Sequence, residues 1–156
     1  MESTSFMQLA IDLAIENVKQ GKGGPFGAVV VKEGKIVGQA ANSVPSTNDP
    51  TAHAEVNAIR QACAHLKTFD LSGCELYASC EPCPMCLAAI YWARIDKVYV
   101  SATKYDAAEV GFDDAFIYEE FALPKENRKV LQVPLLVQEG KAPFKAWKQK
   151  TDKIPY

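Results

Sequence analysis

Two short motifs constrain this chain more than any other feature of its sequence. The first is Thr-Ala-His-Ala-Glu at residues 51–55, and the second is Cys-Glu-Pro-Cys-Pro-Met-Cys at residues 80–86. Each motif runs into a segment with the apolar spacing of a helix, so both sets of polar side chains are expected at helix starts. The fold must therefore bring two helix N-termini together, because a histidine, a carboxylate and paired thiols in this order indicate one shared site.

The donor atoms of these motifs match the preferences of zinc. A catalytic zinc site takes three nitrogen or sulfur ligands from the protein and leaves the fourth position for water. His53, Cys83 and Cys86 supply that set. The two cysteines are three residues apart, which places them on one side of a first helical turn, and Pro84 suits the first helical position. The positive potential of a helix N-terminus favours the thiolate that a metal needs.

Glu55 is expected beside the metal and not on it. Residues two apart point to different sides of a regular helix, so His53 and Glu55 share a site only if that site lies off the helix end, with the small Ala54 between them. Zinc lowers the pKa of a bound water to about 7. A neighbouring carboxylate can take the proton of that water and hand it to a substrate.

Two other interpretations of the motifs remain open at this point. Cys80 is a candidate fourth ligand, which would close the site and make it structural, but it lies on the strand side of Pro82. Cys83 and Cys86 also have the spacing of a redox pair, but that interpretation leaves His53 and its neighbouring carboxylate without a role. The two motifs together favour the catalytic metal site.

The composition predicts an ordinary cytoplasmic domain. The 156 residues suit one domain, of which 48% are hydrophobic. The net charge of -2 and the absence of a long basic run disfavour tight binding to nucleic acid. No apolar run is long enough to cross a bilayer, so no membrane partner is expected, and the N-terminus lacks the pattern of a signal peptide. The five cysteines are expected to be reduced.

Hydrophobic periodicity predicts that strands alternate with helices after an initial hairpin. Helices are expected at residues 4–20, 53–66, 84–93, 114–120 and 144–150. Strands are expected at residues 26–32, 35–41, 75–79, 97–102 and 129–137. Pro134 places the last strand at an edge. This order predicts an α/β fold with a mixed five-stranded sheet and helices on both faces.

The two motifs resemble the signature of the zinc-dependent cytidine deaminase superfamily, in which the glutamate is a general acid and base. The resemblance covers essentially the whole chain. It implies the three-layer α-β-α cytidine deaminase-like fold and one Zn²⁺ per subunit with a bound water or hydroxide. Further stretches resemble the small bacterial guanine deaminases of this superfamily, namely residues 23–27, 48–55, 79–86, 90–94 and 106–114.

The narrower resemblance implies hydrolysis of guanine to xanthine and ammonia. Three alternatives stay open. One is a deaminase of another small base, such as isocytosine, cytosine or a triazine. The second is a tRNA adenosine deaminase, which the lack of a basic cluster disfavours. The third is a zinc-stabilised binding module without enzymatic activity.

The resemblance also implies which residues touch a flat base. Phe26 and Trp92 would hold the ring between them, although large aromatic side chains also build plain cores. Asn42, at the end of a predicted strand, offers a donor and an acceptor to the base edge, or else caps its own loop. Ala54, between the metal-binding histidine and the catalytic glutamate, is also expected beside the substrate.

The choice of guanine depends on residues far downstream. A buried carboxylate accepts hydrogen bonds from the N–H groups of guanine, and Asp114 is the expected acceptor, with Asp113 capping the next helix. The terminal Tyr156 would close the pocket, unless the tail is frayed. The resemblance further implies a homodimer, in which residues from about 140 to 156 swap onto the partner. We therefore expect a single domain, residues 1–156, that binds a small purine base.

Overall fold

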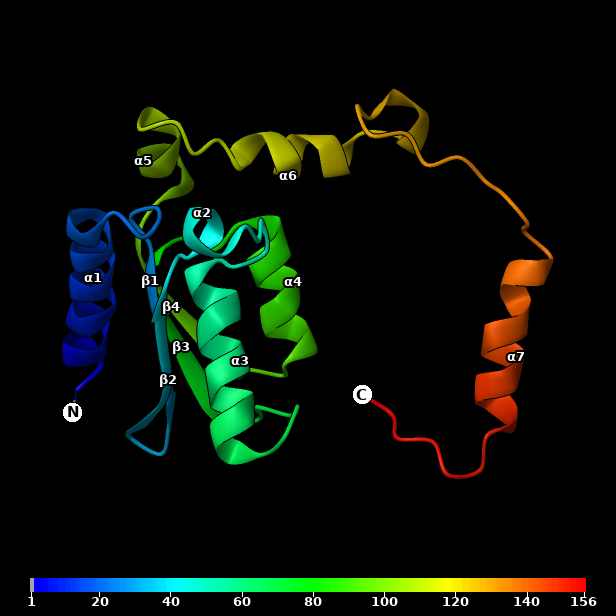
Figure 1. Ribbon diagram of the computed structural model, residues 1–156, viewed down its shortest axis with the longest axis horizontal. Coiled ribbons are helices and arrows are strands. Elements are labelled where there is room, and N and C mark those ends of the chain that lie inside the picture. The colour runs from blue at the N-terminus through cyan, green and yellow to red at the C-terminus, as the bar shows by residue number, and fades with distance from the viewer. Residues whose placement is uncertain (1) are drawn as a thin grey trace. The chain divides into compact units, whose positions relative to one another are not determined.

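The computed structural model describes residues 2–156, which form two compact units that meet between Ile117 and Tyr118. A four-stranded mixed sheet lies at the centre of the first unit (Figure 1). Its strand order is β2-β1-β3-β4, with β1 antiparallel to both of its neighbours and β3 parallel to β4. The strands are β1 (Gly27–Lys32), β2 (Lys35–Ala41), β3 (Cys74–Cys80) and β4 (Lys97–Ala102).

Helices cover both faces of this sheet, so the three-layer α-β-α fold class is confirmed (Figure 1). Side chains of β1 alternate between the two layers, since Val29 and Val31 pack toward the first helix whereas Ala28 and Val30 pack toward the opposite face. The helices of the first unit are α1 (Ser3–Gln20), α2 (Val44–Thr47), α3 (Ala54–Leu66), α4 (Pro84–Trp92) and α5 (Lys104–Glu109).

Two glycines allow the helices to lie close against the sheet. A Cβ atom at Gly27 would collide with the carbonyl oxygen of Ala10 on α1, and one at Gly38 would collide with the carbonyl oxygen of Ala58 on α3. These close contacts fix how α1 and α3 sit on opposite faces of the hairpin. The starts of α3 and α4 are thereby held next to each other, because α4 lies beside α3 on the same face (Figure 1).

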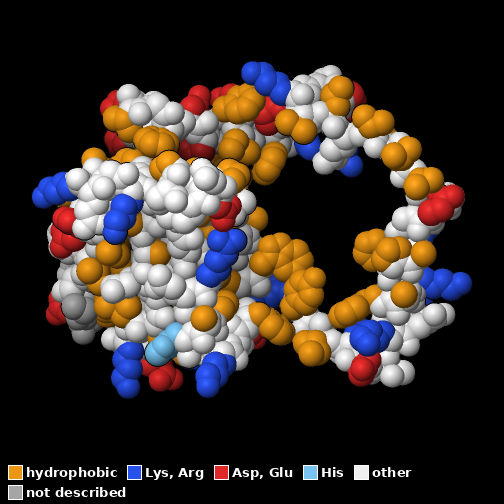
Figure 2. Space-filling model, in the orientation of Figure 1, with side chains coloured by type: hydrophobic (Ala, Val, Ile, Leu, Met, Phe, Trp, Pro, Cys, Tyr) orange, Lys and Arg blue, Asp and Glu red, His pale blue; other side chains and the backbone are white. Residues whose placement is uncertain are grey.

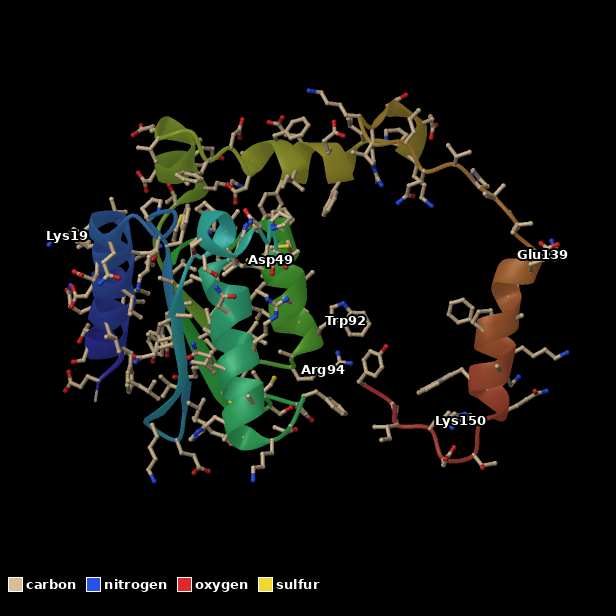
Figure 3. All side chains as sticks on the ribbon, in the orientation of Figure 1. Lys19, Asp49, Trp92, Arg94, Glu139 and Lys150 are labelled. Carbon is tan, nitrogen blue, oxygen red and sulfur yellow. The ribbon has the colours of Figure 1, made fainter. Side chains whose placement is uncertain are left out.

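The last residue of α4 is Trp92, which is 62% exposed. The guanidinium of Arg94 lies 5.9 Å from the centre of its ring, and Figure 3 shows both side chains at the end of the helix. A nine-residue helix is about 13 Å long. Trp92 and the start of α4 therefore lie at opposite ends of that helix.

The second unit, Tyr118–Tyr156, contains the end of α6 (Ala115–Ala122) and α7 (Ala142–Gln149), with short 3-10 turns at Lys125–Asn127 and Glu139–Lys141. None of its side chains is buried, and its apolar residues lie on the surface (Figure 2).

Within residues 2–156, no helix combines the length and the apolar character that crossing a bilayer requires.

The predicted fifth strand at residues 129–137 is wrong. The segment forms no strand, so the described part of the chain has a four-stranded sheet instead of a five-stranded one. Pro134 cannot donate a ladder hydrogen bond, and the apolar side chains around it, such as Val133 at 80% exposed, have no sheet face to cover. The short helices α2 and α5 were not predicted, although the capping box of Thr103 and Asp106 signals the start of α5.

Candidate active site

The two sequence motifs lie at the starts of α3 and α4. His53 is the N-cap residue of α3, Cys83 is the N-cap residue of α4, and both have extended backbone angles. Pro84 and Cys86 follow in the first turn of α4. N-cap positions favour Ser, Thr, Asp or Asn, whose oxygen caps the helix, but neither His53 nor Cys83 makes a side-chain capping bond. Both side chains are therefore free to point off the helix ends.

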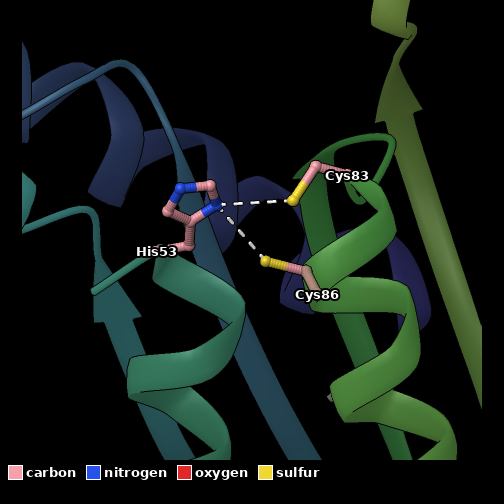
Figure 4. A group of neighbouring side chains, drawn as sticks. All are labelled: His53, Cys83 and Cys86. Carbon is pink, nitrogen blue, oxygen red and sulfur yellow. Dashed lines mark hydrogen bonds between the residues drawn. The ribbon is translucent and has the colours of Figure 1, made fainter. Parts of the chain in front are cut away.

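These side chains meet in one cluster (Figure 4). The Nδ1 atom of His53 lies 3.6 Å from Sγ of Cys83 and 3.4 Å from Sγ of Cys86. All three donor atoms lie within 4.8 Å of one another. A tetrahedral zinc about 2.1 Å from a nitrogen and about 2.3 Å from a sulfur separates those two atoms by about 3.6 Å. The triad therefore fits zinc in both donor type and spacing.

One thiol of the triad, that of Cys83, is favoured in the charged form. A hydrogen bond with Cys86 lowers the pKa of the Cys83 thiol, and a bond with His53 lowers it further. The bond with Cys83 correspondingly raises the pKa of the Cys86 thiol. The pair therefore favours a thiolate at Cys83, which is the form that binds a metal.

Cys80 stands outside the triad, and within residues 2–156 no further Cys, His, Asp or Glu joins it. The Cys80 thiol donates to the carbonyl oxygen of Thr103 at 3.5 Å. Burial raises the pKa of this thiol to about 11, which keeps it protonated. The three-ligand set leaves one tetrahedral position without a protein ligand, as in catalytic zinc sites.

A cavity of ≈ 460 Å³ opens directly onto the triad, which is a typical size for a small-molecule site. His53, Cys83 and Glu55 line one side of it. The Glu55 side chain is only 7% exposed, and burial raises the pKa of its carboxyl group. A carboxyl group with a raised pKa is suited to exchange protons near neutral pH.

Two aromatic side chains also line the cavity. Phe26 and Phe112 pack edge to face, with ring centres 5.0 Å apart and an interplanar angle of 87°. Asn42 lies beside them, and its Oδ1 atom accepts hydrogen bonds from the backbone N–H groups of Gly24 and Val44. This pattern supports the alternative of a loop-capping asparagine, and it also holds the Asn42 side chain at the cavity.

Asp113 and Asp114 have different environments. Asp113 Oδ1 accepts a hydrogen bond from the backbone N–H of Phe116 at the start of α6, which confirms the predicted cap. Asp114 Oδ1 is buried and has no hydrogen-bond partner among the described residues. Burial raises the pKa of Asp114, and the residue lines the cavity. A buried acceptor without a partner in the protein needs a donor from bound water or from a ligand.

Two of the predicted substrate contacts, Ala54 and Trp92, do not line this cavity. Ala54 is fully buried as the first residue of α3. Trp92 was expected to stack on the ring opposite Phe26, but it lies at the far end of α4 from the triad, so it is not a wall of the pocket within its own chain. Tyr156 belongs to the second unit.

The sequence interpretation missed several lining residues. Phe112 pairs with Phe26, Ala107 comes from α5, Pro45 comes from α2, and the loop before α3 contributes Pro50. Phe112 had one signal, because it directly precedes the two aspartates of the Gly-Phe-Asp-Asp stretch. The others are apolar residues in loops or short helices, which sequence alone does not distinguish from ordinary packing.

The sequence and the structure are both similar to those of known deaminases. Residues 1–102 match the model of the cytidine and deoxycytidylate deaminase zinc-binding region. The chain is 51% identical to guanine deaminase of Bacillus subtilis over all of both chains. Its structure superposes on an X-ray structure of guanine deaminase from Bacillus subtilis with a TM-score of 0.97. The match covers 100% of this chain and 99% of that one. It also resembles a tRNA-specific adenosine deaminase of Aquifex aeolicus, at 48% identity over 62% of this chain and 64% of the relative. The chain belongs to the cytidine and deoxycytidylate deaminase family.

Proposed function

We propose that this protein hydrolyses guanine to xanthine and ammonia. The observation that carries the proposal is Asp114 Oδ1, a buried acceptor without a partner in a residue that lines the same cavity as Glu55. A buried unpaired acceptor is unfavourable. Guanine presents N–H donors at N1 and N2 that would pair with it, whereas cytosine presents fewer. The full-length similarity to a guanine deaminase agrees with this substrate.

The metal would be one zinc ion per chain, held by His53, Cys83 and Cys86. A zinc ion held by these residues would lower the pKa of a bound water and so would supply a nucleophile near neutral pH. Glu55 lies in the same cavity and is the residue that moves protons. It takes a proton from the water that bonds to C2 and gives it to the ring nitrogen. It then transfers the second proton to the amine as the C2–N bond breaks and ammonia leaves.

The remaining lining residues hold the base. Phe26 offers an apolar face to the flat ring, and the contact with Phe112 holds the Phe26 ring in place. The Oδ1 atom of Asn42 is occupied by backbone donors, so its Nδ2 group is the part that donates to the base. Bound guanine would stabilise the charged form of Asp114 by donating to it, which offsets the effect of burial on its pKa.

An assay of purified zinc-loaded protein against a panel of bases tests this function. Guanine is expected to release ammonia and yield xanthine, with kcat/KM about 100-fold above that of cytosine or adenine, because neither of these bases presents the adjacent ring N–H and amino donors that guanine offers to Asp114 Oδ1. Transfer RNA is the further competitor, since a relative is named as a tRNA-specific adenosine deaminase. Preferential turnover of cytosine, or of adenosine in tRNA, would show that guanine is not the main substrate.

We also propose that the protein is a homodimer in which residues 140–156 swap onto the partner. An apolar segment without a buried core needs a surface to cover. In this role Tyr156 would close the pocket of the partner subunit, and Trp92 would form part of the same interface. The support is the exposure of apolar residues in the second unit: Val130, Leu131, Val133, Leu135, Leu136, Val137, Phe144, Ile154 and Tyr156.

Light scattering on the purified protein tests the assembly. We expect twice the chain mass of 17.1 kDa, and deletion of residues 140–156 is expected to give a monomer with reduced guanine turnover. An intact chain that is monomeric and fully active would contradict the swap.

A cytoplasmic location is part of the same proposal. All five cysteines are free thiols, and two of them belong to the metal triad. Thiols that must bind a metal have to stay reduced, which the cytosol ensures. An oxidising compartment would favour a disulfide between Cys83 and Cys86 and so remove two of the three ligands.

A further inference from the structure

Two asparagines, on helices that cover opposite faces of the sheet, hold the backbone at the end of β2. Asn17 of α1 donates from Nδ2 to the carbonyl oxygens of Asn42 and Gly24, both at 2.9 Å. Asn57 of α3 donates from Nδ2 to the carbonyl oxygen of Ala41 at 3.1 Å. Carbonyl oxygens only accept, so each amide nitrogen has to face the backbone. Two successive carbonyl groups are thus held by side chains from two different layers.

The network continues from this backbone into the Asn42 side chain. Its Oδ1 atom accepts from the N–H groups of Gly24 at 3.3 Å and Val44 at 3.1 Å. The backbone N–H of Asn42 donates to the carbonyl oxygen of Phe26 at 3.1 Å. Gly24 and Phe26 both line the cavity. The bonds that fix Asn42 therefore also fix the loop that carries Phe26.

Asn17 is the more buried of the two holding residues. Its side chain is only 5% exposed, and its bond to Asn42 joins two residues that are 25 positions apart in the sequence. Asn57 is half-buried and shares its amide group among Ala41, the hydroxyl of Ser43 at 3.0 Å and the carbonyl oxygen of Ala52 at 3.3 Å. The strand they hold is an edge strand, so β2 has no ladder on its outer side to restrain it.

We propose that Asn17 and Asn57 are positioning residues that set the orientation of the Asn42 amide before the base binds. The inference rests on the proposed function, because it takes Asn42 as a contact of the base. Neither holding residue lines the catalytic cavity, so each would act through the backbone of Asn42. Small displacements of a substrate-positioning group have large kinetic effects, and a shift of about 1 Å can cost about 100-fold in rate.

A double-mutant cycle tests whether Asn17 acts through Asn42. Asn17→Ala is expected to lower kcat/KM for guanine about tenfold. The same substitution in an Asn42→Ala background is expected to change kcat/KM less than about twofold, because the group that it positions is already gone. Asn57→Ala should follow the same pattern. Gln20→Ala is the matched control, since Gln20 is an exposed amide on α1 that bonds only to Glu16 within its own helix.

Amide hydrogen exchange gives a second readout that does not depend on turnover. The Val44 N–H donates to Asn42 Oδ1, so its protection reports how firmly that side chain is held. We expect Asn17→Ala to accelerate exchange at Val44 about tenfold while the amides of β1 stay protected. A structural role alone predicts a different result, in which Asn17→Ala lowers stability but leaves Val44 protection unchanged in the folded protein.

The two measurements separate failure of the inference from failure of the proposed function. Equal effects of Asn17→Ala with and without the Asn42 amide would overturn the positioning role, even if guanine is the substrate. Wild-type protein that does not turn over guanine would refute the proposed function instead. In that case faster exchange at Val44 in Asn17→Ala would still support the holding of Asn42, and unchanged exchange would overturn it.

Discussion

Glu55→Gln is expected to lower kcat for guanine about 1000-fold while KM changes little. Glutamine has the shape of glutamate but cannot accept and release the two protons that hydrolysis requires. The carboxyl group of Glu55 is buried, and its raised pKa suits proton transfer near neutral pH. Steady-state measurement of ammonia release from guanine gives both constants. An effect on KM alone would mean that Glu55 holds the base and does not move protons.

Metal content separates this role from ligation. Glu55→Gln should keep one zinc per chain by elemental analysis, because the carboxylate is outside the triad. Cys83→Ser should lose the metal, and Cys80→Ser should keep it, since the Cys80 thiol bonds to the carbonyl oxygen of Thr103. Loss of zinc from Glu55→Gln would make Glu55 a ligand. Wild-type protein that holds zinc but turns over no base would leave a zinc-stabilised binding module as the better description.

Asp114→Ala is expected to lower kcat/KM for guanine by about 100- to 1000-fold. The substitution removes the buried acceptor that the N–H groups of guanine would satisfy, and a site built for hydrogen bonding discriminates strongly by this means. The triad and Glu55 remain in place, so zinc content should not change. Kinetics with guanine, compared with a base that lacks an N–H donor at the matching position, measure the effect.

Asp113→Ala is the matched control for this prediction. The neighbouring carboxylate caps α6 by accepting from the Phe116 N–H. Its loss should cost about 1 kcal/mol of stability, as for other helix caps, but should change kcat/KM only about threefold. Thermal unfolding and the same guanine assay compare the two variants. Equal kinetic losses for Asp113→Ala and Asp114→Ala would show that the segment matters only as structure.

The sequence predicted the metal triad because its signals are local. His53, Cys83 and Cys86 are fixed by their places at two helix starts, and helix starts follow from caps, Pro84 and apolar periodicity. That the two helix starts lie together could be predicted only from the fold, and the fold was implied by the family resemblance. The strands of the central sheet were also predicted, since their β-branched, apolar residues are enriched in short runs between turns.

The errors and omissions have a common physical cause, which is dependence on contacts far along the chain. Residues 129–137 have an apolar composition that favours a strand, but a strand also needs a partner, which no sequence window reveals. Phe112 contacts Phe26, and Asn17 bonds to Asn42, so both depend on residues remote in sequence. Trp92 was expected at the pocket because of its chemistry, yet a helix length separates it from the triad.

Mass spectrometry of the reaction in ¹⁸O-labelled water tests the central claim most directly. Hydrolytic deamination adds one oxygen atom from water at C2 and releases the amine as ammonia. Guanine incubated with wild-type protein is expected to yield xanthine that carries one ¹⁸O atom, while Glu55→Gln leaves the guanine unchanged over the same period. Recovery of unlabelled guanine from the wild-type reaction, with labelled uracil formed from cytosine under the same conditions, would contradict it.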